Sequence, residues 1–197
     1  MSEHMALENL TVLDLTRVLA GPFCTMMLAD MGANVIKIEV PKGGDDTRSY
    51  PPFRAKNLNG ERESVYFANI NRNKKGITLN LKAPEGKEIF KELVKKADIV
   101  VENYRPGVMD KLGLGYDVLK EINPRIIYAA VSGFGCYGPY HLRPGYDILA
   151  QAMGGMMSIT GSKGGEPTRA GSALGDILGG LHVTIGILAA VNARTIT

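Results

Sequence analysis

Cysteine and histidine are scarce in this chain of 197 residues, with two cysteines and three histidines. Cys24 and Cys136 stand alone, and the histidines are scattered rather than grouped with either of them. A zinc site needs closely spaced Cys and His ligands, and small secreted domains carry a framework of paired cysteines. We therefore expect no metal site and no disulfide framework.

The common phosphate-binding motifs are also missing. No Gly-x-Gly-x-x-Gly follows the first predicted strand, and Gly-x-x-x-x-Gly-Lys-[Ser/Thr] occurs nowhere. Dinucleotide binding and P-loop nucleotide binding are therefore poorly supported. The net charge of +3 is too small to indicate a nucleic-acid partner, although it suits a ligand that bears phosphates.

Long hydrophobic runs are few. The first five residues show no basic stretch followed by an apolar core, so no signal peptide is visible and we expect a cytoplasmic protein. Residues 177–191 are strongly apolar, but they are too few for a comfortable membrane span, and His182 and Thr184 interrupt them. We expect a buried helix here and no membrane association.

The remaining composition, 45% hydrophobic and 22% charged, is that of a soluble globular domain or a large piece of one. The apolar, β-branched runs predict strands at residues 12–15, 34–39, 76–81, 98–102 and 125–132. The periodic segments between them predict helices at residues 23–31, 85–96 and 116–122. This alternation predicts an α/β fold, a Rossmann-like open parallel sheet with helices on both faces. Residues 41–64 are polar and indicate one long surface loop.

Three loops follow predicted strands, at residues 16–22, 103–107 and 132–135. Ligands of parallel α/β sheets bind beyond the carboxyl ends of the strands, so these loops are expected to share one crevice. Each loop is weak as a signal by itself, because tight turns need glycine and proline whatever their function.

Basic residues gather near these loops, and two interpretations stay open for them. A lysine beside a loop can hold a phosphate as a point charge, or it can simply be solvated. The residues in question are Arg72, Lys74, Lys75, Lys82, Arg105 and Lys111.

Two aspartates stand out beside glycines. Asp176 lies between Gly175 and the glycines at 179–180, at the start of the apolar run, where it either caps a helix or is a reactive group open to a ligand. Asp147 precedes another apolar stretch and is favoured as a cap of the helix that follows. Tyr146 can offer its hydroxyl to a ligand or serve as a half-buried aromatic.

These segments together resemble the class III CoA-transferases, the CaiB/BaiF group, along almost the whole chain. The likeness is carried by residues 13–22, 32–39, 73–77, 97–107, 145–147 and 175–176. The resemblance implies that Asp176 is a covalent nucleophile that attacks an acyl-CoA thioester. A helix N-terminus at Asp176 would then keep the carboxylate ionised.

The resemblance also assigns the substrates and their contacts. It implies acyl-CoA and a carboxylic acid as substrates, coenzyme A as the shared group, and no tightly bound cofactor. The residues matched to CoA contacts are Val18, Ala20, Leu79, Lys82, Asn103, Tyr104, Arg105, Lys111 and Tyr146.

Three positions depart from the family pattern. Leu19 stands where oxalate-specific members carry a glutamine, which argues against oxalate. Val40 stands where those members place an arginine near the adenine, so Lys42 or another base is expected to substitute. Tyr146 replaces the histidine of the related α-methylacyl-CoA racemases, which removes one of the two bases that a racemase needs.

Length is the largest departure, because family members are about twice as long, with a second, smaller domain. Residues 1–197 are expected to be the N-terminal portion of the large domain, ending in the apolar helix after Asp176, with the small domain absent. The expected partner is a second copy, in a homodimer, or a complementary C-terminal half chain. The favoured function is CoA transfer; the alternatives are a non-catalytic acyl-CoA-binding or split-enzyme subunit, and a racemase-like isomerase.

Overall fold

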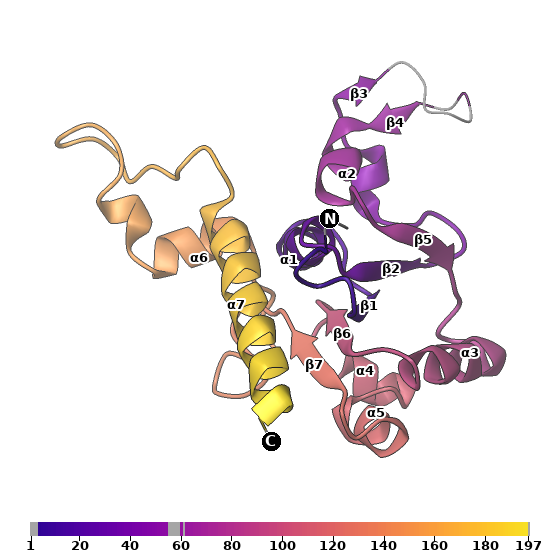
Figure 1. Ribbon diagram of the computed structural model, residues 1–197. Coiled ribbons are helices and arrows are strands. Elements are labelled where there is room, and N and C mark those ends of the chain that lie inside the picture. Colours follow the sequence, from indigo (N-terminus) through magenta and orange to yellow (C-terminus); the bar gives the residue numbers. More distant parts are fainter. Residues whose placement is uncertain (1–3, 55–59, 61, 197) are drawn as a thin grey trace.

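The computed structural model describes residues 4–54, 60 and 62–196. The chain forms a five-stranded sheet in the order β5-β2-β1-β6-β7, and every neighbouring pair is parallel (Figure 1). The strands are β1 (Thr11–Asp14), β2 (Asn34–Glu39), β5 (Lys75–Thr78), β6 (Ile99–Glu102) and β7 (Ile127–Ala130). The predicted α/β class is confirmed. All five predicted strands are present: β2 has the predicted bounds, and the other four have shorter or shifted bounds.

Helices cover both faces of the sheet, because successive side chains of each buried strand point to opposite faces. Leu13 and Val100 belong to one core cluster, whereas Val12 and Val101 belong to the other. The first cluster is closed by α3 (Pro84–Val94), α4 (Val108–Leu112) and α5 (Tyr116–Ile122). The second is closed by α1 (Ala20–Asp30) and α7 (Leu174–Ile196).

Helix α1 begins at Ala20, three residues before the predicted start at Phe23. The Ala-Gly-Pro sequence, which suggested a turn, forms the first helical turn instead. Proline fits there because the N–H groups of the first turn have no partner within a helix. The loop after β1 is therefore short, and it enters the helix directly.

Residues 41–64 are not one surface loop. They contain the short 3₁₀ helix η1 (Asp46–Ser49) and the antiparallel pair β3 (Phe53–Arg54) and β4 (Glu63–Ser64). Helix α2 (Val65–Ile70) follows, and its first turn is capped by the Ser64 hydroxyl, which accepts from the Phe67 N–H at 3.2 Å. Residues 55–59 and 61 of the predicted loop lie outside the described residues.

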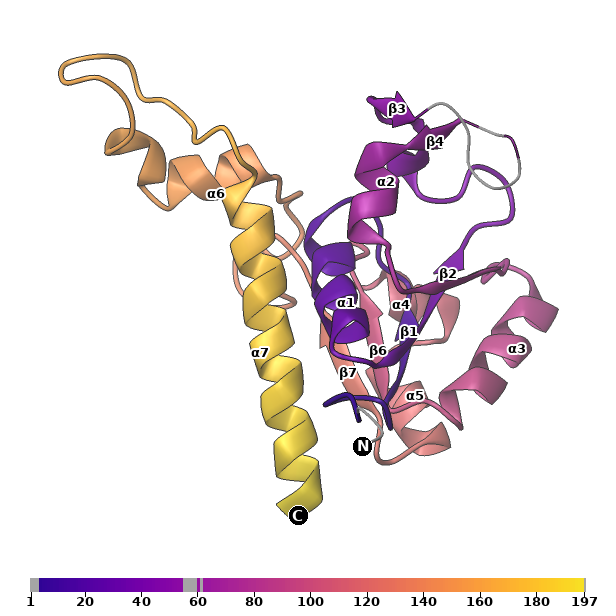
Figure 2. The same cartoon turned by 45° about the horizontal axis from the view of Figure 1, so that its top comes forward.

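An arm of irregular chain leaves the sheet after β7 and returns as α7. It carries α6 (Asp147–Met153) and the 3₁₀ helix η2 (Met156–Ser158), and both views show it projecting away from the sheet (Figures 1 and 2). Helix α7 then runs past α1 and β7, and Arg194 near its end pairs with Asp98 at 2.8 Å.

The expectation of a buried helix after Asp176 is wrong for this chain. Within α7 only Gly180, Thr184 and Ile187 are buried, because a single face of the helix meets α1 and the sheet. In the described part of the chain α7 is the one helix long and apolar enough to cross a membrane by length and composition, and 17% of its apolar window is buried. Core helices of soluble proteins pass the same test.

Candidate active site

The loops after β1 and β6 meet at the point where the order of the sheet reverses. From β1 the chain continues to β2 on one side, and from β6 it continues to β7 on the other. Asn103 bridges the two loops: its Oδ1 accepts from the Arg17 N–H at 2.9 Å, and its Nδ2 donates to the Arg17 carbonyl at 2.7 Å. Two of the three predicted loops are therefore joined at the topological switch point, where the predicted crevice would lie.

The third predicted loop, after β7, is joined to the segment before α6. Gly133 and Gly145 cross so closely that a β-carbon placed on either would lie 2.1 Å from the Cα of the other. Only glycines allow this approach. The crossing therefore fixes the position of Tyr146 and the start of α6. The Ser132 hydroxyl is buried here and has no hydrogen-bond partner within the described chain.

Asp176 is the third residue of α7, and two glycines of its motif set its position. A β-carbon on Gly175 would lie 2.8 Å from Cβ of Ala150 in α6. A β-carbon on Gly180 would lie 2.5 Å from the carbonyl oxygen of Ala20, at the start of α1. The glycines around Asp176 therefore serve close helix packing, and they bring the first turns of α7 against α6 and the start of α1.

The cap at the start of α7 comes from Asp147, not from Asp176. Asp147 Oδ1 accepts from the Gly175 N–H at 2.8 Å, and its Oδ2 accepts from the side-chain amide of Gln151 at 2.8 Å. Asp147 is itself the first residue of α6, and the preceding Tyr146 makes no side-chain cap there. The expected cap of α6 by Asp147 and the alternative of a cap by Asp176 are therefore both corrected. Asp147 caps α7 instead, through Gly175, which lies 28 residues further along the chain.

The Asp176 carboxylate is half-buried, and no described residue donates a hydrogen bond to it or pairs with it as a cation. Burial raises its pKa above the usual range, and the nearby negative charge of Asp147 adds to that effect. This direction is opposite to the expected stabilisation of the ionised form. Burial and the Asp176 charge also raise the pKa of Tyr66 in α2, so Tyr66, which the sequence did not single out, lies within electrostatic range of the site.

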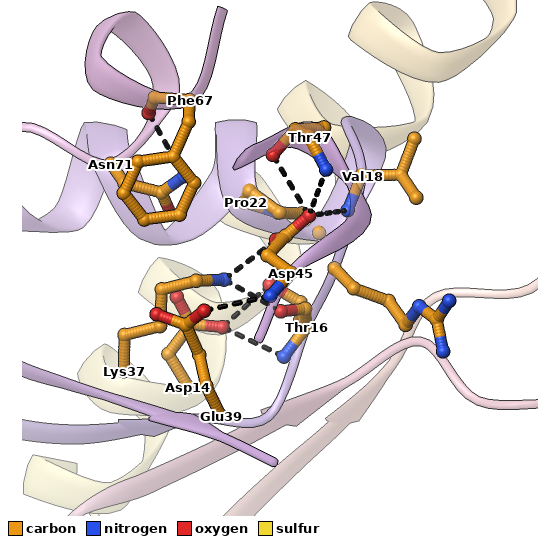
Figure 3. A network of polar contacts seen from close by, with 12 residues as sticks. Asp14, Thr16, Val18, Pro22, Lys37, Glu39, Asp45, Thr47, Phe67 and Asn71 are labelled. Atoms are coloured by element: carbon orange, nitrogen blue, oxygen red, sulfur yellow. Dashed lines mark hydrogen bonds and ion pairs between the residues drawn. The ribbon is translucent and has the colours of Figure 1, made fainter. Parts of the chain in front are cut away.

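Lys74, considered from sequence as a phosphate ligand or a solvated lysine, is neither. Its side chain is 1% exposed, and Nζ donates to Asp14 Oδ2 at 3.1 Å and to the Pro22 carbonyl at 3.0 Å. Asp14 is fully buried beneath the β1 loop and also accepts from the Thr16 N–H (Figure 3). Burial alone would raise the pKa of Asp14, but the ammonium groups of Lys74 and Lys37 lower it, which keeps Asp14 ionised.

A second buried pair adjoins the first. Lys37 Nζ donates to Asp45 Oδ2 at 3.0 Å and to the Thr16 carbonyl at 2.8 Å. Local sequence did not predict this pair, because Lys37 lies within a predicted strand and Asp45 within a predicted surface loop. The two pairs hold the β1 loop at Thr16, whose N–H donates to Asp14 and whose carbonyl accepts from Lys37; Figure 3 shows Asp14, Thr16, Lys37 and Asp45 together.

The residues matched to CoA contacts are not all brought together. Val18, Ala20 and Asn103 belong to the two joined loops and the start of α1, so they lie near one another at the switch point. Leu79 packs against the core cluster under α3, and Lys82 is exposed beyond β5, two strands away from β1.

The remaining matched residues differ in exposure. Tyr104 packs against the core cluster, whereas Arg105 and Lys111 are exposed and pair with no acid within the described residues. Tyr146 is 66% exposed at the start of α6, so the interpretation as a half-buried aromatic is wrong. Among the described residues no group of three potential metal ligands is found.

Glu102, at the end of β6, was not singled out by its sequence. Its Oε2 accepts from the Tyr104 N–H at 2.7 Å, and its Oε1 accepts from the Tyr128 hydroxyl at 3.2 Å. Burial raises its pKa to about 7 despite these hydrogen bonds. The sequence signal was an acid at the end of an apolar strand, directly before the Asn103 loop.

Fold and site together define a Rossmann-like α/β protein with an unpaired carboxylate in the first turn of α7, the helix that packs against α1 and α6. The chain belongs to CoA-transferase family III, whose sequence profile matches residues 7–197. That match includes α7, which is therefore part of the family's fold.

Relatives of known activity resemble the chain along nearly its whole length. It is 52% identical to an acyl-CoA transferase of Fusarium pseudograminearum over 98% of this chain and 43% of that protein. It is 50% identical to an acetyl-CoA:oxalate CoA-transferase of Acetobacter aceti over 95% of this chain and 47% of that protein. The chain thus spans less than half the length of these curated relatives.

Solved structures show the same fold. A CAIB/BAIF family protein from Brucella suis matches with a TM-score of 0.93 and 45% identity, covering 98% of this chain and 50% of that one. A protein from M. tuberculosis matches with a TM-score of 0.88 and 36% identity, covering 97% of this chain and 52% of that one.

Proposed function

We propose that this chain supplies the nucleophile of a CoA-transferase, which moves CoA from an acyl-CoA thioester to a free carboxylic acid. The single observation that carries the proposal is the Asp176 carboxylate, half-buried and unpaired within the described residues. The other carboxylates nearby, Asp14, Asp45 and Asp147, are all hydrogen-bonded. A carboxylate that is left without a partner beside a binding crevice is available to react.

The reaction proceeds in four balanced acyl transfers. A carboxylate oxygen of Asp176 attacks the thioester carbonyl, the C–S bond breaks, and a mixed anhydride and CoA thiolate result. The thiolate attacks the aspartyl carbonyl of the anhydride, which releases the donor acid and leaves an aspartyl-CoA thioester. The acceptor carboxylate then displaces CoA thiolate from Asp176, and the thiolate attacks the acceptor's acyl carbon. Acceptor-CoA leaves, and the Asp176 carboxylate is regenerated.

The surroundings of Asp176 suit this chemistry. Its place in the first turn of α7 puts it at the positive end of a long helix, which favours the negative charge that develops on oxygen. Partial burial strips water from the carboxylate, and a less hydrated carboxylate is the stronger nucleophile. Val18, Ala20 and Asn103 in the adjoining loops are proposed to hold the pantetheine arm, and the unpaired Arg105 and Lys111 to hold phosphates.

The acyl donor and acceptor belong to the proposal only as classes. The relatives act on different acids: oxalate in Acetobacter aceti, and glutarate in the Mus musculus enzyme, which is 50% identical over 95% of this chain and 42% of that one. Leu19, beside Val18, is proposed to disfavour oxalate.

The exposed face of α7 is proposed to pack against further protein. Leu178, Leu181 and Ile185 on that face are 43%, 39% and 56% exposed. A stripe of this kind is usually covered in an assembled protein. A second copy of the chain or a complementary C-terminal half is the proposed cover, and a cytoplasmic location is proposed with it.

Trapping of the covalent intermediate tests the proposal. The protein is incubated with acyl-CoA, quenched with hydroxylamine or borohydride, and digested for peptide mass spectrometry. We expect a mass change at Asp176, and we expect Asp176→Ala to lose both the adduct and CoA exchange while it still binds CoA. Asp117 is the control, since it lies in the first turn of α5 away from the crevice, and Asp117→Ala should leave the adduct unchanged.

Two results would overturn the proposal. CoA binding by calorimetry with no adduct and no exchange, in a folded protein supplied with its partner, would make this a non-catalytic acyl-CoA-binding subunit. Exchange of deuterium at the α-carbon of a branched acyl-CoA without transfer would indicate an isomerase.

A further inference from the structure

Val18 has a backbone conformation that its residue type disfavours. Its φ is 69°, in the left-handed region, where the only other described non-glycine residue is Asn73. Asparagine tolerates that region, whereas a β-branched side chain does not, because its branched Cβ crowds the backbone there. A valine in this state needs contacts that hold it.

Those contacts come from side chains distant in the sequence. The Val18 N–H donates to Asp45 Oδ1 at 3.2 Å. The Thr16 carbonyl accepts from Lys37 Nζ at 2.8 Å, and Asn103 holds both backbone polar groups of Arg17. Three consecutive residues of the β1 loop are thus fastened through their backbones, and Asp45 holds the strained one directly.

Asp45 is built to act as an anchor. Its side chain is 0% exposed and pairs with Lys37, whose side chain is 2% exposed. Besides Val18, Asp45 Oδ1 accepts from the N–H of Thr47 at 3.0 Å and from its hydroxyl at 2.8 Å. Burial alone would raise the pKa of Asp45, but Lys37 and the Thr47 N–H lower it, so the carboxylate stays charged.

The anchor is itself held in place. The backbone N–H of Asp45 donates to Glu39 Oε2 at 2.7 Å, and Glu39 is clamped by Arg48 through contacts of 2.8 and 2.6 Å. Figure 3 shows the Val18 side chain directed away from the Asp45 carboxylate. Burial of an ion pair carries a desolvation cost, so the Lys37–Asp45 pair is weak evidence for a gain in stability. Its contribution here is to fix the orientation of the Asp45 carboxylate.

We propose that Asp45, oriented by Lys37, is a positioning residue that holds Val18 in the left-handed conformation and so shapes the β1 loop for the CoA arm. This inference rests on the proposed function, in which Val18 contacts CoA. Asp45 itself does not touch the ligand. Without the anchor, Val18 relaxes to negative φ, its side chain moves, and the crevice loses a preformed wall.

Limited trypsin digestion tests the positioning without CoA, because the bond after Arg17 is a tryptic site. In Asp45→Asn, cleavage between Arg17 and Val18 is expected to accelerate about tenfold relative to cleavage at other sites. Asp98→Asn is the matched control: Asp98 also accepts from a backbone N–H, that of Thr11 at 2.9 Å, and pairs with an arginine, but it lies at the opposite end of the sheet. Equal cleavage after Arg17 in both variants would overturn the proposal.

CoA affinity, measured by calorimetry, supplies the second test through a double-mutant cycle. Asp45→Asn is expected to weaken CoA binding about tenfold in the Val18 protein. Glycine adopts positive φ as readily as negative φ, so the same substitution should weaken binding much less in a Val18→Gly background. Equal losses in both backgrounds would show that Asp45 does not act through the Val18 backbone.

The outcomes separate the inference from the function on which it rests. Failure of the unchanged protein to bind CoA would contradict the proposed function, while the digestion test still decides whether Asp45 anchors Val18. Normal CoA binding by Asp45→Asn, with the unchanged protein binding CoA, would contradict the inference alone. If Asp45→Asn fails to fold, Lys37→Met replaces it in both measurements. Lys37→Met keeps the Asp45 carboxylate but removes the partner that orients it, so the same faster cleavage after Arg17 and the same weaker CoA binding are required.

Discussion

Gly180→Ala should destabilise the protein relative to Gly179→Ala, although the two residues are neighbours in one helix. A β-carbon on Gly180 would lie 2.5 Å from the Ala20 carbonyl oxygen and 3.3 Å from Cδ1 of Phe23, whereas one on Gly179 would have nothing within 4 Å. Either alanine gains about 1 kcal/mol of helix propensity over glycine. The difference between the variants therefore isolates the steric cost of pushing α7 away from α1, about 1–3 kcal/mol.

Urea denaturation followed by circular dichroism measures that difference. Gly179→Ala is expected to raise the free energy of unfolding by up to about 1 kcal/mol, and Gly180→Ala to leave it unchanged or lower it by up to about 2 kcal/mol. Both should keep the slope of the denaturation curve, since neither changes the surface exposed on unfolding. Equal stabilisation by both alanines would refute the close approach of α7 to α1, and with it the placement of the first turns of α7 beside the start of α1.

Three further substitutions test the electrostatics of the site. Lys74→Met should lower the free energy of unfolding by about 3–5 kcal/mol, because it leaves Asp14 buried and unpaired. Urea titration of this variant with and without Asp14→Asn measures how much of the lost free energy of unfolding the second substitution restores. The pKa of Glu102 in the folded protein is raised to about 7. The stability that Glu102 contributes is therefore fully present below about pH 4.5 and is lost as the pH rises through 7, a decline of about 3 kcal/mol. Glu102→Gln should remove this decline from the thermal stability measured across pH. Asp147→Asn removes a like charge and should lower the pKa of Asp176, which carboxyl carbon NMR titration follows; an unchanged or higher pKa would contradict the assignment of Asp147 as its neighbour.

Local sequence was a good guide where residues act through their own neighbours. The short β-branched runs formed the five parallel strands, and residues 116–122 formed α5 with the predicted bounds. It was a poor guide where a residue's partner lies far along the chain. Asp147 caps a helix through a residue 28 positions away, and residues 41–64, which are mostly polar, contribute the buried Asp45 that accepts from the Val18 N–H.

The same distinction between local signals and distant partners applies to the candidate site. Its candidate residues, including Asp176 between glycines and the Asn103 loop, were proposed from motifs, and the family match confirms the family that those motifs indicated. The roles of individual groups were not. Lys74 was expected at a ligand or in solvent and is buried against Asp14, while Asp176 was expected to be a cap or to be stabilised as an anion and instead has a raised pKa.

The sequence by itself determined the α/β alternation, the family and the identity of the candidate nucleophile, because hydrophobic periodicity and ordered motifs are properties of neighbouring residues. Tertiary structure alone decided which charges are paired, which glycines are needed for helix contact, and that α7 leaves one apolar face exposed. The physical reason is that burial, pairing and close packing depend on distances between segments far apart in the chain. Asp176 is available because no described residue donates a hydrogen bond to it or pairs with it as a cation, and that becomes visible only once the helices around it are in place.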